Sequence, residues 1–125
     1  MARQTRIAFP KRGDIYLVNF DPTVGSEIKK TRPALILQND VANHYSPITI
    51  IAAITSRIEQ HLYPTEVLIE ARKSGLGRPS IVLLNQIRSI DKQRLIRKMG
   101  RIDPEIMKKV DRALEISVGL ASLSH

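Results

Sequence analysis

The residue types best suited to chemistry lie where two strand-like segments begin or end. Arg32 precedes Pro33 and the apolar run Ala34–Leu37, and the polar stretch before it contains Lys29 and Lys30. Pro33 restricts the backbone of Arg32 to extended conformations. A guanidinium held in this way, beside two ammonium groups, is suited to binding a phosphate. An Arg that only begins a strand at a solvated surface explains the same pattern equally well.

Thr55 is the second candidate. It closes the run Ile48–Thr55, which is β-rich and apolar on both faces, as expected of a central strand. Polarity returns at once with Ser56 and Arg57, so the Thr55 hydroxyl is free to leave the core. A hydroxyl at such a boundary more often ends a strand than takes part in catalysis, and spacing alone favours that simpler role.

The sequence does not predict a metal site or any other cofactor. His44, His61 and His125 are far apart along the chain, and there is no Cys to complete a zinc site. The 12 carboxylates form no close cluster for Mg²⁺, and neither a P-loop nor a G-x-S-x-G motif is present. What remains is a mechanism without a metal, or no catalysis.

The charge of the chain points to a polyanionic partner. The 125 residues, 42% of them hydrophobic, fit one globular domain, with a formal net charge of +8. The segment Arg72–Arg101 contains nine cations and a single acid, Asp91, and so concentrated a charge favours a nucleic-acid site. Only 4% of the residues are aromatic, which argues against a stacking platform for single strands. No secretory signal and no cysteine are present, which fits a cytoplasmic protein.

Six strand-like runs can position these side chains. They are Ile15–Phe20, Ala34–Leu37, Ile48–Thr55, Thr65–Glu70, Ile81–Leu84 continued past a kink by Gln86–Ile90, and Leu95–Ile102 as an edge strand that Gly100 bends. In the first run, Ile15 and Leu17 share one face, while Tyr16, Val18 and Phe20 share the other. Three shorter features are a helical turn capped by Asp40 (41–45), a glycine-containing turn (73–78) and a turn capped by Asp91 (92–94).

A helix follows the last strand. Asp103 is a capping carboxylate, Pro104 suits the first helical position, and Ile106, Val110, Ala113, Leu114 and Ser117 fall on one stripe. The helix is expected to end near Leu120. Residues 1–12 are expected to form a poorly ordered basic arm, and residues 13–125 a single domain. Five to seven short strands with one terminal helix indicate a mainly β, strand-rich barrel or sheet.

The segment 12–40 also resembles a known family. It contains RGDIYLVNFDPTVGSE and TRPALILQND, and it resembles the opening of the MazF/PemK toxins of bacterial toxin–antitoxin pairs. The likeness continues through SPITIIAAITSRI and LLNQIRSIDKQRL into the final helix, and spans roughly residues 12–120. It implies an SH3-like barrel with a C-terminal α-helix, usually as a homodimer.

The resemblance also implies an activity. Members of this family act as mRNA interferases, that is, as endoribonucleases that cut single-stranded RNA at specific sequences without a metal and so block translation and growth. RNA carries its own nucleophile, because the 2′-OH next to the scissile phosphate can attack in line and leave a 2′,3′-cyclic phosphate and a 5′-OH. By the same match, Arg32 is the principal catalytic residue and Thr55 is its partner at the phosphate. A guanidinium is a poor base, so Asp21, Glu27 or a water is left to accept the 2′-OH proton.

Base recognition is expected from loops rather than strands. The candidates for RNA binding are Phe20, Thr23, Ser26, Glu27, Lys29 and Lys30 in the first loop, and Asn85, Gln86 and Arg88 farther along. The sequence departs from some relatives in two places. Ile28-Lys29-Lys30 stands where others carry glycines, which stiffens the loop, and Asn85 stands where a Glu is common, which alters the hydrogen bonds offered to a base.

A toxin of this family implies an antitoxin partner, expected to be an acidic and partly disordered peptide that folds over the basic groove. Two alternative functions stay open. One is a gyrase poison of similar fold that cuts nothing, and the other is a non-catalytic barrel that binds RNA or the ribosome.

Overall fold

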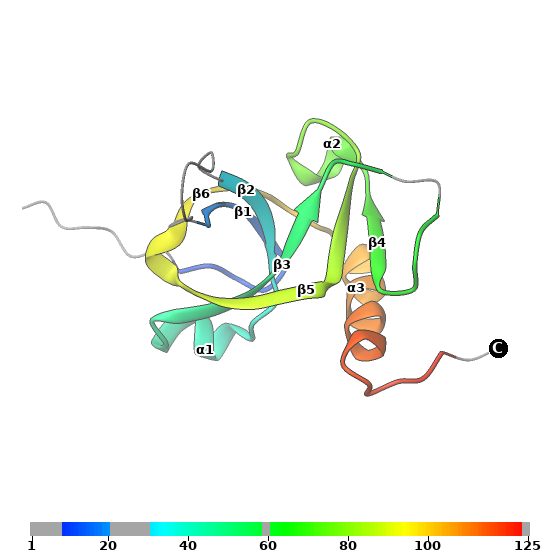
Figure 1. Ribbon diagram of the computed structural model, residues 1–125. Coiled ribbons are helices and arrows are strands. Elements are labelled where there is room, and N and C mark those ends of the chain that lie inside the picture. The colour runs from blue at the N-terminus through cyan, green and yellow to red at the C-terminus, as the bar shows by residue number, and fades with distance from the viewer. Residues whose placement is uncertain (1–8, 21–30, 59–60, 124–125) are drawn as a thin grey trace, which may run out of the picture.

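The chain folds around one antiparallel sheet, with strands in the order β4-β5-β3-β2-β1-β6 (Figure 1). The computed structural model describes residues 9–20, 31–58 and 61–123. The strands are β1 (Asp14–Asn19), β2 (Thr31–Ile36), β3 (Ile48–Thr55), β4 (Glu66–Ile69), β5 (Ser80–Asp91) and β6 (Leu95–Arg101). The helices are α1 (Asp40–Tyr45), α2 (Ala71–Ser74) and α3 (Pro104–Ser117), with a 3-10 turn η1 (Lys92–Arg94). All six predicted strands are therefore present, and the predicted fold class is confirmed.

The sheet buries apolar side chains on both faces. The main core lies beneath α3 and consists of Ile15, Leu35, Leu37, Ala52, Ile54, Val67, Ile69, Val82, Leu84, Ile102, Val110 and Ala113. The second core consists of Tyr16, Val18, Ala34, Ile36, Ile51 and Ile90. The predicted alternation along β1 is confirmed, since Ile15 enters the main core while Tyr16 and Val18 enter the second. Burial, with a smaller contribution from Asp14, raises the pKa of the Tyr16 hydroxyl.

Two irregularities curve the sheet. The register of β3 against β5 shifts between Ala52, which pairs with Ile87, and Ala53, which pairs with Leu83, and this shift is the predicted kink in β5. At the other edge, the register between β1 and β6 shifts near Gly100, where the sequence predicts a bend. Figure 1 shows the long, bent course of β5 between β4 and β3.

A close backbone contact joins the two edges of the curved sheet. Gly75, which ends α2 in the left-handed conformation (φ 82°), lies against Met99 and Gly100 of β6. A Cβ atom at Gly100 would overlap the carbonyl group of Ser74, and one at Gly75 would overlap that of Met99. Because α2 follows β4 and β6 is the opposite edge, this contact closes the sheet into a small barrel.

Helix α3 covers the main core as predicted, but it ends earlier. Asp103 caps it by accepting a hydrogen bond from the Ile106 N–H at 3.1 Å. Its last residue is Ser117, not Leu120, and the Ser117 hydroxyl donates to the Leu84 carbonyl at 2.7 Å. No helix of the described residues is long and apolar enough to cross a membrane.

Two local predictions were wrong in detail. The cap of α1 is Asn39, whose side chain accepts a hydrogen bond from the Ala42 N–H at 2.8 Å, because the helix already begins at Asp40. The Asp40 carboxylate accepts instead from the Arg12 N–H at 2.7 Å. The predicted turn at 73–78 begins inside the short helix α2, since Ser74 is helical and the chain reverses only at Gly75.

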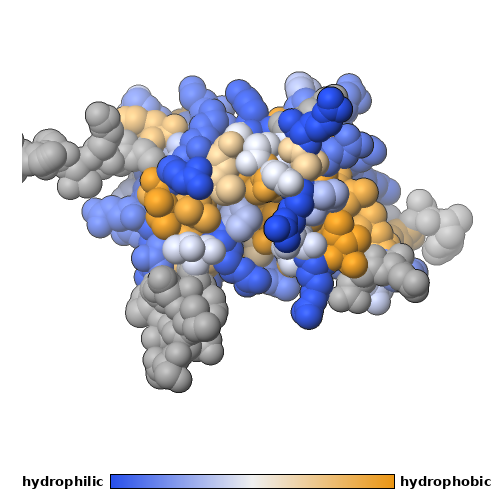
Figure 2. Space-filling model, turned by 90° about the horizontal axis from the view of Figure 1, so that it is seen from above, coloured by the Kyte–Doolittle hydropathy of each residue, from blue (hydrophilic) through white to orange (hydrophobic). Residues whose placement is uncertain are grey.

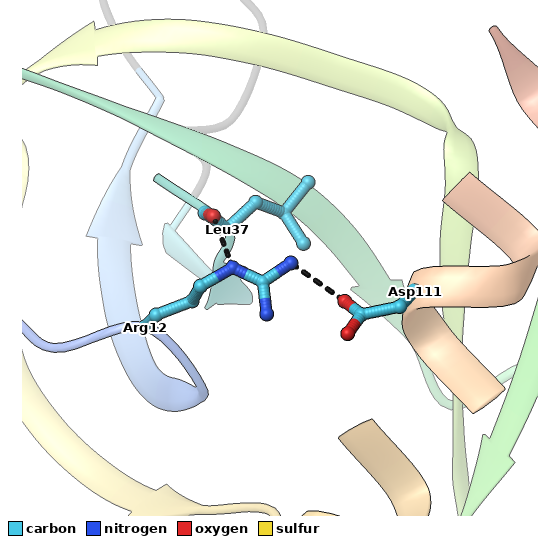
Figure 3. Close-up of polar contacts among 3 residues, drawn as sticks. All are labelled: Arg12, Leu37 and Asp111. Atoms are coloured by element: carbon cyan, nitrogen blue, oxygen red, sulfur yellow. Dashed lines mark hydrogen bonds and ion pairs between the residues drawn. The ribbon is translucent and has the colours of Figure 1, made fainter. Parts of the chain in front are cut away.

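Arg12 connects the start of the chain to the last helix (Figure 3). Its Nε donates to the Leu37 carbonyl at 2.8 Å, and its guanidinium binds the Asp111 carboxylate of α3 at 2.6 Å. Within the predicted basic arm, residues 9–12 contact the domain and Pro10 is buried, while residues 1–8 lie outside the described part of the chain. Arg12 therefore belongs structurally to the domain.

Replacing Arg12 by Ala is expected to lower the free energy of unfolding by about 1–2 kcal/mol, because a carbonyl and a carboxylate each lose a charged donor that is only partly solvated. Urea unfolding measures the change. The matched control is Lys108→Ala, since Lys108 faces Glu105 at 4.0 Å on the exposed surface of α3. That control should change stability by less than about 0.5 kcal/mol, and equal losses in the two variants would contradict the role given to Arg12.

Candidate active site

The register between β2 and β3 brings Arg32 and Thr55 together. Ala34 pairs with Ala53, and the register runs on through Leu35 and Ile36 without a shift. Continued two residues toward the end of β3, the same register places Arg32 directly opposite Thr55. Paired residues of neighbouring strands project from the same face of a sheet. The guanidinium and the hydroxyl therefore belong to one surface.

This surface is the rim of the second core. Ala34, two residues after Arg32, and Ile51, four residues before Thr55, lie on the same face, and both are completely buried. At the strand ends the burial stops, since Thr55 is half-buried and Arg32 is exposed. Figure 2 views the molecule from the side of α2, where hydrophilic side chains protrude across the middle of the face between two apolar areas. The buried parts of β2 and β3 thus fix the positions of two side chains that can reach a ligand.

Arg32 and Thr55 form a ridge between two hollows. The strand-side hollow, about 260 Å³, is lined by Arg32, Ala53, Ile54, Thr55, Arg57, Glu66, Ile81, Leu83 and Gln86. The loop-side hollow, about 290 Å³, is lined by Arg32, Pro33, Ile54, Thr55, Ser56, Leu76, Arg78, Ser80 and Met99. An extended chain crossing the ridge would place one segment in each hollow, and the group between the segments would lie on Arg32 and Thr55.

The hydrogen bonds at the ridge leave both groups able to act. The Thr55 Oγ1 accepts from the Arg57 N–H at 3.1 Å, which orients the side chain and leaves its own O–H free to donate. Among the described residues, no carboxylate lies within 4.0 Å of the Arg32 guanidinium. Among the described residues that line the hollows, the charged ones are Arg32, Arg57, Arg78 and Glu66. The ridge thus presents a cation and a hydroxyl donor in positive surroundings.

The other predicted binding residues divide into three groups. Gln86 lies in the strand-side hollow, whereas Asn85, also exposed, lines neither hollow. The guanidinium carbon of Arg88 lies 5.2 Å from the ring centre of Phe20, so these two form a cation–π pair beside the second core. The candidates Thr23, Ser26, Glu27, Lys29 and Lys30, together with Asp21, lie outside the described residues.

Three charged residues of the hollows were not predicted as site residues. Arg57 follows Thr55 by two positions, so its charge next to a strand end could have marked it as a site residue. Arg78 belongs to the cationic segment 72–101, so the clustering of charge could have marked it in the same way. Glu66 gave no such signal. It enters the strand-side hollow only because β4 pairs with β5, which in turn pairs with β3.

Other features of the described structure lie away from the ridge. A larger hollow, about 850 Å³, is lined by residues of β4 and α3 and is mostly apolar, and Glu66 is on its border too. No group of three or more His, Asp or Glu residues within the described ranges could hold a metal ion.

Comparisons with known proteins identify the family of the chain. Residues 11–118 match the family described as PemK-like, MazF-like toxin of type II toxin-antitoxin system. The chain is 51% identical over 110 residues to Endoribonuclease EndoA of Bacillus subtilis (strain 168), covering 88% of this chain and 95% of that protein. The fold resembles that of MazE-MazF from Deinococcus radiodurans, with a TM-score of 0.78, 27% identity, and 91% and 99% of the two chains covered. For MazF from the same organism the TM-score is 0.72, at 28% identity, with 90% and 98% covered. The chain therefore belongs to the family of PemK-like, MazF-like toxins of type II toxin–antitoxin systems.

Proposed function

We propose that this chain is the toxin of a toxin–antitoxin pair and acts as an endoribonuclease that cuts single-stranded RNA at specific sequences without a metal. The observation that carries the proposal is the position of Arg32 opposite Thr55 on an exposed ridge between two hollows. The 51% identity to EndoA, whose name states the same activity, supports it.

The reaction is an in-line transesterification. The 2′-oxygen of the nucleotide before the scissile bond attacks the phosphorus, the bond to the 5′-oxygen breaks, and the products are a 2′,3′-cyclic phosphate and a 5′-OH. Negative charge grows on the non-bridging oxygens, where the Arg32 fork and the Thr55 hydroxyl both donate. Arg32 also protonates the leaving 5′-oxygen. The proton of the 2′-OH passes to a water, to Asp21 or to Glu27.

The rest of the RNA is bound by residues around the ridge. The Phe20–Arg88 pair, Gln86 and the β1–β2 connection contact bases and phosphates, and Asn85 reaches the RNA beyond the hollows. An acidic antitoxin peptide competes for the same arginines, so salt weakens both complexes. Two copies of the chain form the working unit in the cytoplasm, and cleavage of mRNA there arrests growth.

Arg32→Ala is expected to lower the rate of RNA cleavage by at least about a thousandfold in the presence of EDTA, because one group supplies both charge stabilisation and the proton. Arg32→Lys should fail similarly, since an ammonium lacks the planar fork. Gel analysis of a broad RNA pool measures the rates. The matched control is Arg97→Ala, an exposed cation of β6 that lines neither hollow, which should cut at nearly the wild-type rate.

Intact RNA after prolonged exposure to the wild-type protein in EDTA would contradict the proposal and favour a non-cutting gyrase poison. Cutting by Arg32→Ala at the wild-type rate would leave the activity in place but remove Arg32 from the chemistry.

Thr55→Val removes one hydroxyl donor and nearly preserves the shape of the side chain. The expected loss in kcat is about a hundredfold, in line with the loss of one donor to developing charge. Thr55→Ser keeps the hydroxyl and should retain most of the activity. Single-turnover cleavage of a labelled RNA separates this effect from binding. Equal rates for Thr55→Val and the wild-type protein would show that Thr55 only ends the strand.

A further inference from the structure

Glu66 is an unexpected residue in the strand-side hollow. It is the only acid among the described residues that line either hollow, and Arg32 and Arg57 line the same hollow. A carboxylate there repels RNA phosphates, so it weakens binding unless it contacts a different part of the nucleotide. Nucleic-acid sites of this charge gain specificity from contacts to the bases.

The sheet places Glu66 at a distance from the ridge that suits a neighbouring nucleotide. Glu66 pairs with Leu83, Leu83 pairs with Ala53, and Ala53 precedes Thr55 by two residues on the same face. The backbone of Glu66 is thus two strands away from β3, roughly 10 Å at the usual strand spacing. A phosphate held at the ridge leaves the adjacent base over the interior of the hollow, within reach of a Glu side chain.

The Glu66 carboxylate is held in place without being saturated. Its Oε1 accepts from the Tyr63 N–H at 3.1 Å, and the side chain is only half-buried. A carboxylate offers about four lone-pair sites on its two oxygens, so acceptor capacity remains for a base. It has no proton to donate when ionised. Gln86, which can donate and accept, lines the same hollow.

We infer that Glu66 determines specificity at the nucleotide in the strand-side hollow by accepting a hydrogen bond from an amino group on the base edge. Cytosine, adenine and guanine each carry such a group, whereas uracil has a carbonyl oxygen, O4, in the place of the cytosine amino group, and the carboxylate repels that oxygen. The inference rests on the proposed ribonuclease activity at Arg32 and Thr55. It adds a base-reading residue to that site.

The test compares Glu66→Gln with the wild-type protein on RNA oligonucleotides that contain one cleavage site. For each position flanking the cut, two oligonucleotides are compared, one with cytosine and one with uracil at that position. The two differ there by an amino group in place of a carbonyl oxygen. At one flanking position the wild-type protein should prefer cytosine to uracil by at least about tenfold in kcat/KM. Glu66→Gln should reduce this ratio to within about threefold, because an amide can donate to the uracil oxygen.

Glu70→Gln is the matched control. It removes the same charge just beyond the end of β4, but Glu70 lines only the hollow against α3, so the cytosine-to-uracil ratio should stay at its wild-type value. Urea unfolding and a second variant, Glu66→Ala, which should also lose the preference, show that the change is not a folding defect. An unchanged ratio in Glu66→Gln, or an equal loss of rate on every substrate, overturns the inference and leaves the ribonuclease proposal standing. RNA left uncut by the wild-type protein removes both proposals.

Discussion

The antiparallel register between β2 and β3 is the constraint on which the site depends. Successive side chains of a strand point to opposite faces, so a slip of one residue would move Arg32 or Thr55 to the other side of the sheet. The register is fixed in the interior, where Ala34 and Ala53 pair and Ile36 and Ile51 are fully buried. Two polar side chains at the edge of the core are therefore positioned by apolar packing several residues away.

The barrel around this pair supplies rigidity and leaves the rim open. The approach of Gly75 to Gly100 joins the two edges of the curved sheet, and Arg12 ties the start of the chain to α3 through Asp111. Neither contact touches the ridge. Substitutions at these positions are therefore expected to act on stability first, while substitutions at the ridge are expected to act on chemistry, because Arg32 is exposed.

Much of the fold could be predicted because its signals are local. A few neighbouring residues are enough to predict β1 from its alternation, β3 from its apolar run and the start of α3 from Asp103-Pro104. Arg32 and Thr55 could be selected as candidates because they are polar residues at strand ends. The rest depends on pairing between distant segments. Glu66 reaches the strand-side hollow through two strand pairings, and the Asp40 carboxylate accepts from the Arg12 N–H, 28 residues earlier in the chain. Neither effect is visible in local spacing.

In the proposed reaction, the RNA attacks its own backbone while Arg32 and Thr55 hold the phosphate in line. The most direct test replaces one ribose, the one before the scissile bond, by 2′-deoxyribose in an otherwise unchanged RNA, and follows binding and cleavage in EDTA. We expect the substituted strand to bind within a few-fold of the all-RNA strand and to remain uncut at that bond. Cleavage of the deoxy-substituted strand at the same bond would contradict the proposed reaction, because a water or another nucleophile would then have to attack the phosphorus.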